Sequence, residues 1–154
     1  IGQTVNFKVI KENINMTSAR LSEKKPVFVS RIPIRWGDMD AMGHVNNAVF
    51  FRYLEQARIE WYSHIGRGEN AGLETVVVHC YCTYYAPLAY PGEIEIRTYA
   101  GSPGRSSFDI VQEIRRSDTP DTICAIGGSK VVWVDPKTGK STPLPESIRK
   151  LMID

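Results

Sequence analysis

The chain has 154 residues, of which 42% are hydrophobic and 23% are charged. This composition predicts one soluble, globular domain and excludes a disordered chain. The formal net charge of +2 is too small to indicate a nucleic-acid partner, because such proteins carry concentrated positive charge.

The cysteine count and the hydropathy pattern indicate the cellular compartment of the protein. Cys80, Cys82 and Cys124 are an odd number of thiols, which favours a reducing compartment over a disulfide framework. We expect all three to be small buried residues. No apolar run approaches the roughly 20 residues that span a bilayer, and no secretory signal pattern opens the chain. We therefore expect a cytoplasmic protein without a membrane partner.

The N-terminal segment differs from the rest of the chain. Residues 1–15 lack a starting Met and have a different composition, whereas Met16 is a plausible native start. We interpret residues 1–15 as a non-native or disordered extension, and residues 16–154 as a single domain.

The first predicted elements are a strand and a long helix. Over residues 27–36, β-branched or aromatic residues alternate with polar ones, which predicts a strand. Pro33 lacks a backbone donor and indicates an edge strand or a bulge. Asn46 or Asn47 can cap the helix at its start, and Gly66 can end it. Between them, apolar residues recur at helical spacing: Phe50, Leu54, Ala57, Trp61 and Ile65.

Four further strands follow the helix. Alternating residues predict them at 75–85, 93–101, 106–116 and 121–135. The links at 86–92, 102–104 and 117–120 are short, so we expect each to join antiparallel neighbours. Gly127 and Gly128 indicate a bulge in the last strand.

This order of elements, with a short closing helix at residues 145–152, predicts an α+β architecture. An antiparallel five-stranded sheet packs on one long helix. Such a sheet leaves exposed edges, and pairing with a second copy of the chain would cover one of them. We therefore expect a homo-oligomer.

The loop before the helix carries the chemistry. Residues 35–47 read RWGDMDAMGHVNN and bring carboxylates and amides to the helix N-terminus. There, unpaired backbone N–H groups and the positive end of the helix dipole can polarise a bound oxygen. An aspartate in such a place is otherwise a common capping or turn residue, so Asp40 alone does not identify an enzyme.

Residues 37–47 (GDMDAMGHVNN) followed by residues 50–55 (FFRYLE) resemble the hotdog-fold acyl-CoA thioesterases of the 4-hydroxybenzoyl-CoA thioesterase type. The resemblance implies a hotdog fold, in which an antiparallel five-stranded sheet wraps around one long central helix. It also implies hydrolysis of acyl-CoA to a free carboxylic acid and coenzyme A. The family further implies a homodimer or homotetramer with each site at a subunit interface.

The family pattern assigns roles to particular residues. Its catalytic carboxylate is the second aspartate of G-x-D-x-D, which corresponds to Asp40, acting as a nucleophile or as a general base. The backbone N–H that polarises the thioester carbonyl corresponds to Asn47. By the same resemblance, Arg105 and Ser106 meet the phosphates of coenzyme A, although a solvated turn explains Arg105 equally well.

The loop departs from the founding thioesterase of that family. His44, Asn46 and Asn47 stand where that enzyme carries apolar or aromatic residues, which favours the general acyl-CoA branch over an aromatic substrate. We expect His44 and Asn46 to contact the substrate. The alternatives are that backbone groups satisfy His44 and that Asn46 is a helix cap.

Neither a metal nor a cofactor is expected. The loop matches part of an EF-hand, but Met42 and Val49 stand where oxygen ligands are required. Cys80 and Cys82 lack a second pair of zinc ligands at the usual spacing.

Two rival functions stay open. One is a hotdog-fold enoyl-CoA hydratase or dehydratase, although that branch resembles a pattern with His five positions after Asp, and His44 lies four after Asp40. The other is a non-catalytic acyl-CoA-binding module, which would have no need of Asp40.

Overall fold

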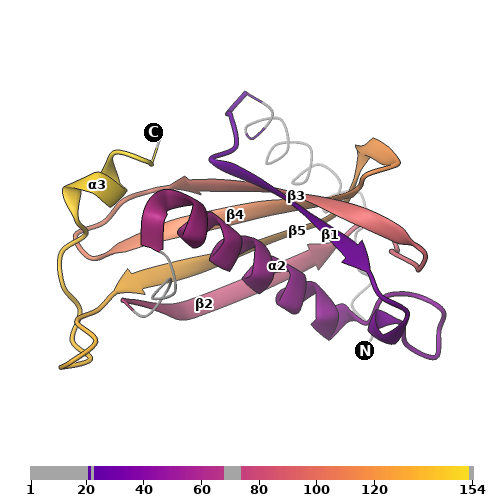
Figure 1. Cartoon of the computed structure of the whole chain (residues 1–154), viewed down its shortest axis with the longest axis horizontal. Coiled ribbons are helices and arrows are strands. Elements are labelled where there is room, and N and C mark those ends of the chain that lie inside the picture. The colour runs from indigo at the N-terminus through magenta and orange to yellow at the C-terminus, as the bar shows by residue number, and fades with distance from the viewer. Residues whose placement is uncertain (1–20, 22, 68–73, 153–154) are drawn as a thin grey trace, which may run out of the picture.

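The computed structural model describes residues 21, 23–67 and 74–152, so the expectation for residues 1–15 lies outside the described residues. Five antiparallel strands form one sheet in the order β1-β3-β4-β5-β2, and helix α2 lies across one face of it (Figure 1). The predicted hotdog architecture is confirmed. The elements are β1 (Phe28–Ile34), α2 (Asn47–Tyr62), β2 (Thr75–Tyr84), β3 (Gly92–Gly101), β4 (Ser107–Arg116), β5 (Thr119–Trp133) and the short α3 (Glu146–Arg149).

Helix α2 begins at the predicted cap and ends at Tyr62, and a π-helix continues it to the predicted Gly66. The side chain of Asn46 accepts a hydrogen bond of 2.9 Å from the backbone N–H of Ala48, as an N-cap does. A π-turn at Ser63–Arg67 ends the helix, where Gly66 has φ +82°. The helix buries residues at helical spacing against the sheet: Phe50, Tyr53, Leu54, Ala57 and Trp61.

One predicted strand neighbour is wrong. Strand β2 pairs with β5, and β3 pairs with β1 and β4, so the link between β2 and β3 joins strands that do not touch. Both sides of β3 are already occupied, and the chain therefore crosses the end of the sheet to reach it. The links between β3 and β4 and between β4 and β5 do join neighbours. Pro33 lies on β1 at the sheet edge, as expected.

The predicted bulge at Gly127 and Gly128 is also wrong. The register of β5 with both neighbours runs through these residues without a shift. They allow close approach instead, because a Cβ on Gly127 would clash with Leu54 of α2, and one on Gly128 would lie 2.7 Å from the Tyr81 ring. The glycines therefore let α2 and Tyr81 pack directly on the two faces of β5.

The expectation of three buried cysteines holds for one. Cys124 is buried and Cys82 half-buried, but Cys80 is exposed. Strand β2 lies at the edge of the sheet, so its side chains have covering neighbours on one side alone. A register shift between Val77 and His79 also removes the simple alternation on which the expectation rested.

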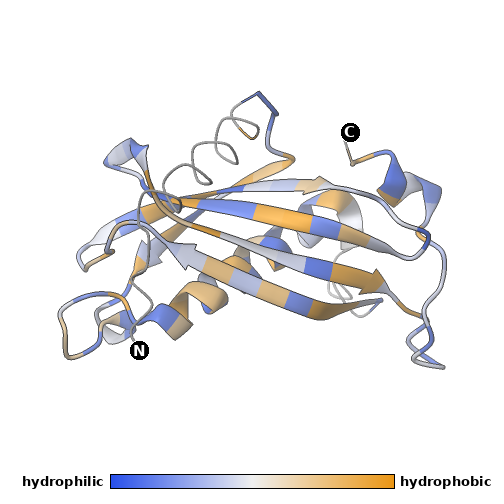
Figure 2. Cartoon of the chain, turned by 180° about the vertical axis from the view of Figure 1, so that it is seen from behind, coloured by the Kyte–Doolittle hydropathy of each residue, from blue (hydrophilic) through white to orange (hydrophobic). Residues whose placement is uncertain are grey.

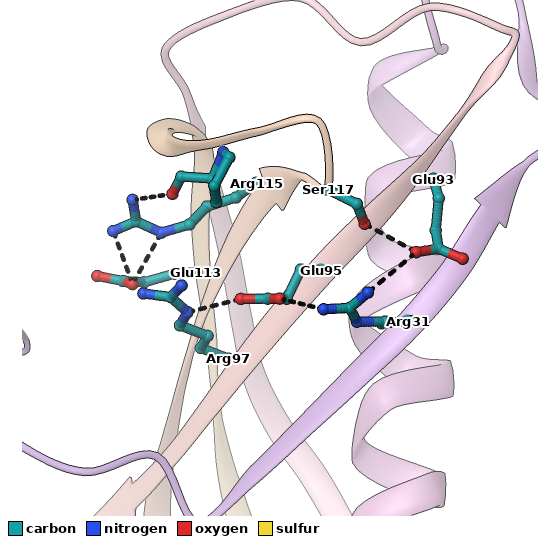
Figure 3. A network of polar contacts seen from close by, with 8 residues as sticks. Arg31, Glu93, Glu95, Arg97, Glu113, Arg115 and Ser117 are labelled. Carbon is teal, nitrogen blue, oxygen red and sulfur yellow. Dashed lines mark hydrogen bonds and ion pairs between the residues drawn. The ribbon is translucent and has the colours of Figure 1, made fainter.

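Ion pairs cross the sheet on the face away from α2 (Figure 3). Arg31 of β1 and Arg97 of β3 both bond Glu95, at 3.3 and 2.8 Å. Arg115 bonds the buried Glu113 of β4 at 3.1 Å. Along the strands, hydrophilic and hydrophobic residues alternate (Figure 2). Arg31–Glu95 joins β1 to β3, whereas the other two pairs lie within β3 and within β4.

We predict that Gly127→Ala destabilises the protein by about 1 to 3 kcal/mol, because the added methyl group overpacks the contact with Leu54. Chemical denaturation would measure the change. Gly37→Ala is the control, since nothing lies within 4 Å of its added Cβ. Equal stability of the two variants would contradict the close-approach role of Gly127.

Candidate active site

The loop between β1 and α2 folds into a closed turn. The backbone N–H of Asp40 donates to the carbonyl of His44 at 2.9 Å, and Gly43, with φ +81°, donates back to Asp40 at 3.1 Å. Val45 then donates to the carbonyl of Leu88 at 2.8 Å, from the link that follows β2. Asp40 is therefore fixed beside the start of α2.

Asp38 anchors this turn to the helix. Its Oδ2 accepts hydrogen bonds from the Tyr53 hydroxyl at 2.6 Å, the Arg35 backbone N–H at 2.9 Å and Arg35 Nε at 3.3 Å. Burial acts to raise the pKa of Asp38, but the bonds from Tyr53 and Arg35 outweigh it, and the pKa is lowered. Asp38 is thus a charged, buried support for the loop.

Asp40 and Asn47 line one hollow of about 370 Å³ at the start of α2. The Oδ1 atom of Asp40 accepts the N–H of Met42 at 2.9 Å, and no described residue bonds its Oδ2. Among the hydrogen bonds between described residues, none uses the backbone N–H of Asn47. A carboxylate oxygen and an unpaired helix N–H are therefore both available at the same cavity.

Tyr84 forms part of the wall, and sequence reasoning missed it. Its hydroxyl donates to the carbonyl of Asn47 at 2.9 Å, and its ring meets that of Phe50 edge-on at 4.9 Å. Burial, together with the neighbouring Cys82, raises the pKa of Tyr84 to about 12, so the phenol keeps its proton. Burial also raises the pKa of Cys82 to about 11, which keeps that thiol neutral. The pairing of β2 with β5 places Tyr84 here, and no local pattern shows that pairing.

The other candidate residues lie away from this hollow. His44 is exposed, and Asn46 uses its side-chain oxygen for the helix cap; neither lines the hollow. Arg105 and Ser106 lie in the turn between β3 and β4, where the Arg105 carbonyl accepts the Leu144 N–H at 2.9 Å, close to α3. That turn and the start of α2 are at opposite ends of the sheet (Figure 1). Within one chain, Arg105 and Asp40 are therefore not brought together.

In the described part of the chain, no group of three His, Cys, Asp or Glu residues is arranged to hold a metal ion. The described helices include none long and apolar enough to cross a membrane.

A family comparison agrees with this geometry. The model of the thioesterase-like superfamily matches residues 34–151. The chain belongs to this superfamily. The match includes the last residue of β1, the loop, α2 and strands β2 to β5, so both the fold and the class of thioester hydrolase predicted from sequence are confirmed.

Several relatives of this thioesterase-like chain are known. A Pseudomonas aeruginosa structure, "PA2801 protein, a putative Thioesterase", is 38% identical over 82% of this chain and 98% of that one, with a TM-score of 0.77. A Thermus thermophilus thioesterase, complexed with coenzyme A and Zn, is 29% identical over 84% and 93%, with a TM-score of 0.73. A "Putative esterase" of Aquifex aeolicus is 26% identical over 82% and 98%.

We predict that Tyr53→Phe destabilises the protein by about 1 to 3 kcal/mol at neutral pH, because it removes a hydrogen bond to a buried carboxylate. The folded-state pKa of Asp38 lies below its ordinary value of 3.8. Its stabilising contribution is therefore present above that ordinary value and is lost as the pH falls through the folded-state pKa. The difference between parent and variant should shrink in acid.

Denaturant unfolding across the pH range would test this. Tyr90→Phe is the control, because Tyr90 is exposed. A stability difference for Tyr53→Phe that stays constant down to the lowest pH would show that Asp38 is not responsible.

Proposed function

We propose that this protein hydrolyses acyl-CoA, with water converting the thioester to a carboxylic acid and the thiol of coenzyme A. The observation that carries the proposal is that Asp40 and the unpaired N–H of Asn47 line one hollow. The coenzyme A bound to the related Thermus thermophilus thioesterase supports the choice of thioester.

The backbone N–H of Asn47 would donate a hydrogen bond to the carbonyl oxygen of the thioester. This oxygen gains negative charge as the tetrahedral intermediate forms, and a preorganised donor stabilises it by roughly 3 kcal/mol. The helix dipole adds to the same effect. Tyr84 supports this arrangement, because its bond to the Asn47 carbonyl holds the first residue of α2 in place.

Asp40 can act by two routes, and both stay open. As a nucleophile, its free Oδ2 attacks the carbonyl carbon, the C–S bond breaks, the thiolate of coenzyme A leaves and takes up a proton, and water hydrolyses the resulting anhydride. As a general base, Oδ2 takes a proton from the attacking water while the C–S bond breaks in the same way. In both routes the bond from Met42 to Oδ1 fixes the carboxylate.

We predict that Asp40→Asn lowers kcat about a hundredfold or more, because an amide can neither attack nor accept the proton. Steady-state hydrolysis of acyl-CoA substrates of several chain lengths would measure the loss. Asp109→Asn is the control, since Asp109 bonds Lys130 away from the hollow. A folded Asp40→Asn variant that keeps its rate within a few-fold would remove Asp40 from the mechanism.

We also propose that two copies pair through the open edge of β2, as a dimer or as a tetramer built from such dimers. Apolar or aromatic residues of β2 are unusually exposed: Val76 at 47%, Val77 at 38%, Val78 at 57%, Tyr81 at 41% and Tyr84 at 42%. An edge strand also presents unpaired backbone groups. Twofold pairing of β2 with its copy would bury the exposed apolar side chains and pair the free backbone groups of the edge.

This pairing would bring Arg105 into reach of the site. Two copies of β2 related by a twofold axis run antiparallel, so the far end of one subunit lies near the start of α2 in the other. Arg105 and Ser106 of the partner subunit would then stand on the side where Asp40 lies. In this arrangement a guanidinium can bind the phosphates of coenzyme A.

We further propose a cytoplasmic location. Its support is that Cys80, Cys82 and Cys124 are all free thiols, as a reducing compartment maintains them.

We predict that Val78→Lys separates the subunits and removes most activity, because it places a charge on the apolar edge of β2. Light scattering and hydrolysis assays would measure both effects. Val29→Lys is the matched control on the opposite edge, where Val29 is 43% exposed. A monomeric Val78→Lys variant with full activity would exclude a shared site.

We predict that Arg105→Ala raises KM for acyl-CoA about tenfold or more while leaving kcat nearly unchanged, through loss of a charge-assisted phosphate contact. An acyl-pantetheine without the nucleotide should be hydrolysed equally by parent and variant. Equal losses on both substrates would mean that Arg105 supports structure.

Hybrid dimers show which subunit supplies Arg105. Mixing Asp40→Asn and Arg105→Ala chains should restore sites with the parental KM, since one site of each hybrid then holds an intact Asp40 and an intact Arg105 of the partner subunit. If Arg105 acts within its own chain, every active site in the mixture keeps the raised KM.

A further inference from the structure

A second hollow lies on the same side of α2 as the candidate active site. It measures about 250 Å³ and lies between α2 and β2, with Phe51 and Leu54 on one wall and Cys80 on the other. Asn47, Phe51 and Leu54 recur at helical spacing and so share one side of α2. Cys80 and Tyr84 both face α2 from β2. The two hollows therefore occupy one seam between the helix and the edge strand.

The floor of the second hollow is polar and incompletely bonded. Ser129 lines it, is 5% exposed, and its hydroxyl has no hydrogen-bond partner among the described residues. The register with Cys80 places Ser129 on the side of β5 that faces α2. Buried polar groups in native proteins are nearly always paired, with protein, water or ligand. Ser129 therefore needs a partner that the described residues of its own chain do not supply.

Gln112 adds an acceptor to the same floor. It is 1% exposed, and its Nε2 donates to the Leu54 carbonyl at 3.1 Å and to Thr98 Oγ1 at 3.3 Å. The Leu54 carbonyl can only accept, so this bond fixes the orientation of the amide. No hydrogen bond from a described residue reaches Oε1 of Gln112. A ligand hydroxyl can donate to Oε1 and accept from Ser129.

We propose that the second hollow binds a hydroxyl group on the acyl chain of the substrate, and that Ser129 forms a hydrogen bond with it. This hydroxyl lies about 10 Å from the thioester carbonyl. This inference rests on the proposed hydrolysis of acyl-CoA. The distance follows from the helix, because seven residues separate Asn47 from Leu54 and each rises about 1.5 Å. An extended chain advances about 1.2 Å per bond, so the hydroxyl oxygen lies about eight bonds from the carbonyl carbon. The substrate class is a medium-length hydroxyacyl-CoA.

The test compares two substrates of equal length, 8-hydroxyoctanoyl-CoA and nonanoyl-CoA, in which a methyl group replaces the hydroxyl. The parent should hydrolyse the hydroxylated substrate with a kcat/KM about tenfold higher, since the methyl group leaves the polar floor unpaired. Ser129→Ala should abolish this preference, so that the two substrates have the same kcat/KM.

Ser30→Ala is the matched control. Ser30 is also a buried serine, at 2% exposed, whose hydroxyl has no partner in the described part of the chain, but it lines neither hollow. This variant should keep the preference. A parent without preference, or a Ser129→Ala variant that retains it, would overturn the inference while leaving acyl-CoA hydrolysis intact.

Two further results separate the alternatives. Equal losses on both substrates in Ser129→Ala would show that Ser129 binds the pantetheine arm or supports the fold, and would overturn the assignment to the acyl chain. If a folded parent hydrolyses neither these two substrates nor acyl-CoA substrates of other chain lengths, the proposed function fails. Calorimetric binding of 8-hydroxyoctanoate and nonanoate then tests the hollow without turnover, and equal or absent binding of the hydroxylated acid would exclude it.

Discussion

A buried carboxylate holds the junction on which the site depends. Asp38 accepts hydrogen bonds from the Arg35 backbone before the turn and from Tyr53 in the second turn of α2. Its own carbonyl accepts the Asn46 N–H at 2.9 Å. The strand end, the N-cap and the helix are thus tied to one residue. Since an unpaired buried charge is costly, the loop has little freedom to depart from this geometry.

The fixed junction explains how a short loop can carry chemistry. A donor to a developing oxyanion is effective when it is oriented before the reaction begins. Asn46 caps the helix by accepting the N–H of Ala48 with its side chain, and the N–H of Asn47 has no acceptor among the described residues. Under the proposed function, the residue that caps the helix is therefore next to the residue whose N–H stabilises the oxyanion, and the cap helps to orient that N–H.

The sequence predicted those features that local spacing determines. The period of Phe50, Leu54 and Ala57 predicts the buried face of α2, and the cap at Asn46 and the ending at Gly66 follow from side-chain chemistry and backbone freedom. The proposed pair of Asp40 and Asn47 came from the resemblance of one motif to a known family, and both residues line one hollow.

Features that depend on distant contacts were not predicted. Nothing local shows that β2 pairs with β5 rather than with β3, so Tyr84 was missed and Cys80 was assigned to the core. Gly127 and Gly128 likewise read as a bulge, because a glycine that admits a distant side chain and one that bends a strand look alike in sequence.

Strand length sets the last constraint on the site. Ten residues of β4 extend over about 34 Å, so Asp40 and Arg105, at opposite ends of the sheet, cannot meet one small group within a subunit. A twofold partner reverses the direction of the sheet and places its own far end beside the site. If Asp40 and Arg105 serve one substrate, a single subunit contact explains two features. It covers the exposed edge of β2, and it brings Arg105 of the partner subunit to the site that contains Asp40.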